Sequence, residues 1–195
     1  MYNFKQFLNE GSDDITLEQM LDECKPFIRE SKGNLIYRGI DRPIGDVSVS
    51  TPRGDITAYR MVVRLDRRPL NTDNTTHNNF DSWMKEHFGW GGRSQGIFVS
   101  GKILTAAFYG KPFIILPRGD FKYIWTPLVS DLFAIRHNAE TDVDASIEKL
   151  KFTDADLPHA IATGNEISIS CKDYYAIPAT EENISMIGKL IKRGM

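Results

Sequence analysis

Arginine, serine and glutamate side chains occur, in that order, at the ends of three predicted strands. Arg38 lies at the end of residues 34–39, Ser100 ends residues 96–100, and Glu166 begins a segment in which apolar and polar residues alternate. A planar guanidinium can hold a phosphate through two parallel hydrogen bonds, and a carboxylate can stabilise a developing positive charge. These three residues are therefore the candidate functional residues of the chain.

Each of the three residues also has a structural interpretation. Arg38 fits an ordinary arginine at a strand end, and four further arginines compete with it for a functional role. Ser100 fits a cap of a helix that begins near Lys102, because serine is a strong N-cap residue, and Glu166 fits a solvated charge at a strand start. The competing arginines are Arg60, Arg64, Arg67 and Arg68.

Composition and charge exclude several classes of protein. The chain has 195 residues, of which 41% are hydrophobic, a size and composition typical of one globular domain. Lys and Arg number 24 against 26 Asp and Glu, so no global positive field draws the protein to nucleic acid or to an anionic membrane. Apolar runs such as residues 113–116 are far shorter than the roughly 20 residues that span a bilayer. We expect no membrane contact.

Potential metal ligands are scattered along the chain. Cys24 and Cys171 lie far apart, which indicates neither a disulfide framework nor a zinc site, and favours a reduced, intracellular setting. The four histidines occur singly, and His77 and His87 are ten positions apart, so we expect surface or loop histidines and no metal. No Gly-Lys-Ser/Thr follows the glycines of residues 89–92, which excludes a Walker A loop.

The predicted strands cluster late in the chain, and they do not alternate regularly with helices. Residues 41–56, with two prolines and two glycines, are expected to form a loop. This pattern indicates an α+β fold rather than a parallel α/β sheet. Predicted strands cover residues 34–39, 57–65, 96–100, 112–117, 121–125, 166–170 and 173–178, and predicted helices cover residues 17–31, with a kink at Pro26, and 80–88, 102–109, 143–151 and 184–191.

The ordered arginine, serine and glutamate resemble the Arg-Ser-Glu signature of ADP-ribosyltransferases, an NAD-dependent family that includes bacterial toxins and phage enzymes. The resemblance covers roughly residues 34–178 and includes an aromatic-x-Ser motif, Phe98-x-Ser100, with Ala106-x-x-Tyr109 on the following helix. It implies two small, mainly antiparallel sheets that form a cleft flanked by helices. It also implies NAD as co-substrate, without a metal.

The resemblance assigns a role to each residue. Arg38 would hold the NAD pyrophosphate, Ser100 would orient the ribose, and Glu166 would stabilise the positive charge left when nicotinamide departs. Tyr109, or an aromatic such as Phe98 near it, would stack on the nicotinamide ring. Arg93 lies among glycines, where the backbone can approach a ligand closely, and is a reserve phosphate contact.

The chain departs from the family pattern at two places. Ser100-Gly101-Lys102 stands where Ser-Thr-Ser is usual, and Gly164 stands two residues before Glu166, where arginine-modifying members carry Glu or Gln. The acceptor is therefore open and includes a host protein, nucleic acid or water, the last giving an NAD hydrolase. The sequence is also compatible with a non-enzymatic virion or host-interaction protein and with a relative that transfers phosphate at RNA ends.

The first ten residues resemble the capsid-targeting peptides of internal proteins in tailed phages. They lack the apolar stretch of a secretory signal, and Leu8-Asn9-Glu10 before Gly11 matches the motif after which a prohead protease cuts. The resemblance implies a cleavable leader over residues 1–10 and a single domain over residues 11–195. It implies prohead protease and capsid as partners, and a location in the virion interior, then the host cytoplasm.

Overall fold

The computed structural model describes residues 14–68, 73–130 and 143–194. The expected leader, residues 1–10, and the expected cleavage point between Glu10 and Gly11 lie outside this part. None of the described helices combines the length and the apolar character that a membrane crossing requires.

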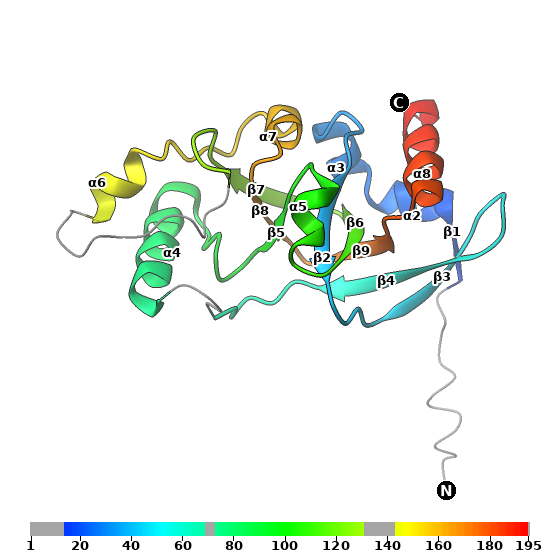
Figure 1. Cartoon of the computed structure of the whole chain (residues 1–195), viewed down its shortest axis with the longest axis horizontal. Helices are drawn as coiled ribbons and strands as arrows, with labels where there is room; N and C mark the ends of the chain where they lie inside the picture. Colours follow the sequence, from blue (N-terminus) through cyan, green and yellow to red (C-terminus); the bar gives the residue numbers. More distant parts are fainter. Residues whose placement is uncertain (1–13, 69–72, 131–142, 195) are drawn as a thin grey trace, which may run out of the picture.

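The described strands form one six-stranded sheet and one three-stranded sheet, and helices pack around both (Figure 1). All neighbouring strands are antiparallel except the pair β1–β3. This arrangement confirms the predicted α+β class. The large sheet has the order β1 (Ile15–Thr16), β3 (Asp46–Ser50), β4 (Ile56–Val62), β9 (Asp173–Pro178), β6 (Lys111–Pro117), β2 (Ile36–Ile40), and the small sheet β5 (Ile97–Val99), β8 (Ile167–Cys171), β7 (Phe121–Trp125).

Most of the predicted helices are present, but the helix Asn74–Phe88 begins six residues before the predicted segment 80–88, and the helix Leu157–Thr163 was not predicted. Thr16 and Gln19 form a capping box at the start of α2. The predicted helix 17–31 is divided at Cys24, just before Pro26, into two helices. The described helices are α2 (Leu17–Glu23), α3 (Lys25–Glu30), α4 (Asn74–Phe88), α5 (Ile103–Ala107), α6 (Val143–Glu148), α7 (Leu157–Thr163) and α8 (Glu181–Gly194).

The loop predicted over residues 41–56 is wrong, because β3 lies within it. Val47 and Val49 are buried against the core, whereas Asp46 and Ser50 are exposed. This is the alternation of a half-buried strand. The prolines and glycines lie in the turns at the two ends of the segment. They led to the prediction of a loop, although a five-residue strand between them pairs with β4.

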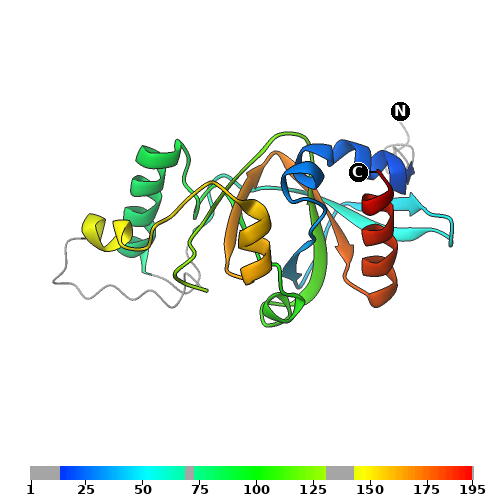
Figure 2. The ribbon, with the colours of Figure 1, turned by 90° about the horizontal axis from the view of Figure 1, so that it is seen from above.

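The interior consists of two apolar clusters. The larger one lies between the six-stranded sheet, the three-stranded sheet and α2, α3, α7 and α8, and it includes Phe27 and Leu116. The smaller one lies at the end of the molecule where Figures 1 and 2 place α4 and α6, and its centre is Phe80, Trp83 and Ile147. The smaller cluster holds α4 against the three-stranded sheet through Ile124.

An ionic network joins the amino-terminal helix to the large sheet. The Nε of Arg118 donates to Glu23 at 2.6 Å, and the Tyr175 hydroxyl donates to the same carboxylate at 2.7 Å. Burial alone would raise the pKa of Glu23, but the hydrogen bonds from Tyr175 and Arg118 outweigh it and hold this pKa below its ordinary value.

We expect the protein to lose part of its stability as the pH falls through the folded-state pKa of Glu23. A group whose pKa is lowered on folding stabilises the folded state above its unfolded pKa and loses that contribution on protonation. Urea unfolding of wild type and Glu23→Gln at about pH 7 and about pH 4 should show a difference that shrinks at the lower pH. An equal difference at both pH values would contradict this coupling.

Candidate functional site

Strand pairing brings the predicted arginine, serine and glutamate to the place where the two sheets meet. Tyr37 and Ser100 exchange two backbone hydrogen bonds of 2.8 and 2.9 Å, which join β2 of the large sheet to the end of β5 in the small one. In the β5–β8 pair Val99 is opposite Ile167, and the next position along each strand is Ser100 and Glu166. Arg38, next to Tyr37, is therefore close to both.

The guanidinium of Arg38 faces the small sheet. Its Nη1 donates a hydrogen bond of 2.7 Å to the carbonyl of Phe98 in β5. Burial lowers the pKa of Arg38, whereas the nearby Tyr174 and Glu166 act to raise it. The charge of Glu166 thus reaches Arg38.

Arg67 is a second guanidinium at this place. It lies over the Phe98 ring, 4.8 Å from the ring centre, and its Nη1 donates to the carbonyl of Gly96 at 2.7 Å. Burial and, to a smaller extent, the positive charge of Arg38 lower the pKa of Arg67 to about 10, although the charge of Glu166 opposes the shift. The sequence offered Arg67 only as one of several competing arginines.

Arg93 supplies the third guanidinium at this place. It lies in a loop that is held by hydrogen bonds to a side chain of α4. The carboxylate of Asp81 accepts hydrogen bonds from the backbone N–H groups of Arg93 at 2.8 Å and Ser94 at 3.1 Å. The Arg93 side chain is buried and its guanidinium lies 5.4 Å from the centre of the Phe80 ring. Its charge contributes to the lowered pKa of Arg67, so the three guanidinium groups form one cluster.

We call Arg38, Arg67 and Arg93 the arginine cluster. Its position was not predictable from spacing, because Arg67 and Arg93 lie on connections whose course depends on tertiary contacts. Tyr174, buried in β9 and close enough to affect Arg38, was also missed. Its only signal is its place in a strand that is buried along its length.

Ser100 is a structural link in this arrangement. It is buried, and its hydroxyl donates to the carbonyl of Gly164 at 2.8 Å while accepting from the N–H of Lys102 at 3.2 Å. Lys102 is itself the N-cap residue of α5, so Ser100 supports the start of that helix from just outside it. The bond to Gly164 ties the segment before Glu166 to the end of β5.

Gly164 has a conformational reason to be glycine. It follows α7 with φ of +74°, the left-handed conformation in which many helices end, and glycine adopts it without steric cost. A side chain there would also meet the stem of Lys102, since an added Cβ would lie 2.4 Å from Lys102 Cδ. The glycine two residues before Glu166 is therefore set by the end of α7.

Tyr109 lies two residues beyond the end of α5 and is 55% exposed, so it is not part of the apolar core. Its backbone is close to β2, because a Cβ on Gly39 would lie 2.3 Å from the Ala106 oxygen and 2.6 Å from the Tyr109 carbonyl carbon. Gly39 thus lets the end of α5 approach the strand that carries Arg38.

His137 lies outside the described residues, and one of the other three histidines differs from expectation. His77, predicted to be a surface or loop residue, is buried on α4, and burial lowers its pKa despite the nearby carboxylate of Asp81. His87 stacks on Trp83 with ring centres 3.9 Å apart. Within the described residues, no group of three or more His, Cys, Asp or Glu side chains is arranged to hold a metal.

The arrangement as a whole defines a cationic site with one carboxylate at the junction of two sheets in an α+β protein. No protein-family model, curated protein or solved structure gives a significant match to the chain. The chemistry of the site therefore has to be argued from its residues.

Proposed function

We propose that the chain is an NAD-dependent ADP-ribosyltransferase that modifies a host macromolecule. The observation that carries the proposal is the arginine cluster beside Glu166, at the point where Ser100 joins the two sheets. The positive charges of Arg38 and Arg93 both lower the pKa of the buried Arg67, and such a gathering of cations is costly unless an anion shares the site. A dinucleotide with two phosphates meets this requirement.

In this proposal, some residues of the site bind the NAD phosphates and others act on the ribose from which nicotinamide leaves. Arg38 and Arg67 hold the pyrophosphate, with Arg93 behind them, since paired donors of a guanidinium match phosphate oxygens. Ser100 fixes the turn that carries Glu166, and Glu166 holds the ribose and stabilises positive charge there. Tyr109 and Phe98 are the aromatic groups proposed to orient the nicotinamide ring. Bound NAD supplies the ADP-ribosyl group, with nicotinamide as the leaving group.

The acceptor is proposed to be a side chain other than arginine, or a nucleic acid. This part of the proposal rests on Gly164, whose left-handed backbone leaves no place for a second carboxylate or amide. The proposed biological setting is a tailed phage. In it, a prohead protease cuts after Glu10, the chain is packed in the capsid, and it acts in the host cytoplasm after injection.

One observation favours a second candidate, a non-enzymatic protein that binds the host or the virion with the same fold. Both hydrogen-bonding directions of the Ser100 hydroxyl are used by backbone groups of Gly164 and Lys102. A serine occupied in this way contributes to folding whether or not turnover occurs.

Incubation of the full chain with labelled NAD and a bacterial lysate tests the proposal. We expect label on a macromolecule and an equal amount of free nicotinamide. Nicotinamide without label would indicate an NAD hydrolase, and neither signal, with no thermal stabilisation by millimolar NAD, would favour the non-enzymatic candidate.

Arg38→Lys should raise the KM for NAD by roughly 10- to 100-fold, because lysine cannot make two parallel hydrogen bonds to phosphate. The matched control is Arg64→Lys, since the Arg64 side chain is 71% exposed and, among the described residues, is bonded to the exposed Asp66. Steady-state kinetics of nicotinamide release give both values. An unchanged KM in Arg38→Lys would remove this residue from the phosphate site.

A further inference from the structure

A hollow lies on the face of β2 opposite to the arginine cluster, and we call it the lysine hollow. Its volume is about 570 Å³, and its walls come from β2, the start of α5, α7 and α8. Figure 2 shows α7 and α8 on the two sides of β2, with α5 beside them. Tyr37 lines the hollow, whereas its neighbour Arg38 contacts β5, as expected for successive residues of a strand.

Three lysines line this hollow. Lys189 and Lys192 are one turn apart on α8, and Lys102 comes from the segment before α5. In the described part of the chain, no carboxylate forms an ion pair with any of them, and none lines the hollow. The chain has a net charge of −2, so this gathering of positive charge is local.

A solvated helix face accounts for only part of this charge. A lysine in the last turn of α8 is favoured by the helix dipole, which explains Lys192. It does not explain Lys102, which belongs to another element and whose stem lies across Gly164 at the end of α7. Two separate elements therefore bring positive charge to the same hollow.

The rest of the lining can hold a flat, partly apolar group. Ile161 and Ile184 contribute apolar surface, and the Tyr37 ring lies beside them, partly buried. Burial raises the pKa of Tyr37, so its hydroxyl stays protonated at neutral pH and can donate a hydrogen bond. Among the described residues, no side chain or backbone group is hydrogen-bonded to this hydroxyl.

We propose that this hollow binds a phosphate-bearing ligand of nucleotide size, with the phosphates on Lys102, Lys189 and Lys192 and the ring against Tyr37 and the isoleucines. The volume lies within the roughly 300–1,000 Å³ of small-molecule sites, and point charges on flexible lysines suit phosphate groups. The proposal is independent of the transferase function, because it concerns the other face of β2.

The hollow and the arginine cluster nevertheless share two segments. Tyr37 and Arg38 are neighbours in β2, and the backbone N–H of Lys102 is hydrogen-bonded to the Ser100 hydroxyl. A test must therefore separate the two sites by mutation. The Arg38→Ala variant removes one of the two proposed pyrophosphate contacts of the cluster and keeps the three lysines.

Titration calorimetry with ADP, tripolyphosphate and adenosine tests the proposal. In the Arg38→Ala background we expect ADP to bind, and adding Lys189→Ala and Lys192→Ala to weaken this binding about tenfold or more. The matched control adds Lys85→Ala and Lys122→Ala, two exposed lysines outside the hollow, and should leave ADP affinity unchanged. Adenosine and tripolyphosphate should each bind more weakly than ADP.

Several results would overturn the proposal. The first is that Arg38→Ala does not bind ADP. The second is that the Lys85→Ala and Lys122→Ala control loses as much ADP affinity as the variant that lacks Lys189 and Lys192. The third is that adenosine or tripolyphosphate binds as tightly as ADP. Unfolding temperatures of all variants show whether each is folded, and the exposed positions of Lys189 and Lys192 make that the expected result. Nicotinamide release by wild type reports separately on the transferase proposal, so the two can fail independently.

Discussion

Glu166→Gln is expected to lower the rate of ADP-ribosyl transfer by about 10²- to 10³-fold, with little change in NAD binding. Glutamine keeps the shape of the side chain and removes the negative charge that would stabilise the positive charge on the ribose. The position is well fixed, since the Glu166 backbone N–H donates to the carbonyl of Ser130 at 3.0 Å and β8 begins at the next residue. The measurement is nicotinamide release at saturating NAD.

Glu86→Gln is the matched control for this experiment. Glu86 is exposed on α4, away from the sheet junction, and its loss should leave the rate unchanged. A change in KM rather than in the maximal rate would make Glu166 a binding residue. Equal rates in wild type and Glu166→Gln would remove it from the reaction altogether.

The parts of the fold that the sequence predicted are those with strong local signals. The β8 segment alternates apolar and polar residues, and β6 is a continuous apolar run between lysine and proline, so both strands were predicted within a residue or two. The helix that contains Trp83 was predicted to end at Gly89, which caps α4 with φ of +77°. The alternation in β8 did not predict its burial, however, because Ser168 is buried together with the isoleucines on either side of it.

The parts that the sequence did not predict depend on contacts between distant segments. The candidate Arg38 and Glu166 could be chosen from strand ends, because strand ends are local features. Arg67 could not, since it joins the site only after Gly96 and Phe98 are folded beside it. The three lysines of the lysine hollow could not be grouped from the sequence either, since they become neighbours when α8 packs beside the start of α5.

Asp173→Ala is expected to destabilise the fold by about 3 kcal/mol, the cost of breaking a buried ion pair by removing one partner. Asp173 begins β9 and its side chain is only 7% exposed. Its two oxygens accept from Arg118 at 2.8 Å and from Arg60 at 3.2 Å, so it links β9 to the end of β6 and to β4. Without it, the mostly buried Arg118 retains only Glu23 as a counter-charge.

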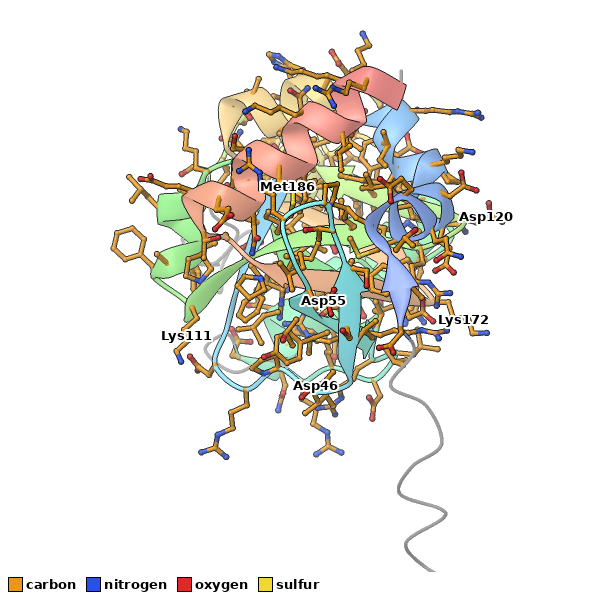
Figure 3. All side chains as sticks on the ribbon, turned by 90° about the vertical axis from the view of Figure 1, so that its right-hand side faces the viewer. Asp46, Asp55, Lys111, Asp120, Lys172 and Met186 are labelled. Atoms are coloured by element: carbon orange, nitrogen blue, oxygen red, sulfur yellow. The ribbon has the colours of Figure 1, made fainter. Side chains whose placement is uncertain are left out.

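Asp120→Ala separates this network from a general effect of lost charge. Asp120 lies two residues after Arg118 and is exposed, at the edge of the molecule that also carries Lys172 (Figure 3). Its replacement should change the free energy of unfolding by less than about 0.5 kcal/mol. Urea unfolding of Arg118→Ala, Asp173→Ala and the double variant then measures the coupling, because the double variant should lose clearly less than the two single losses combined. Losses that add, or a loss in Asp173→Ala no larger than in Asp120→Ala, would mean that packing rather than the ion pair holds β9 in place.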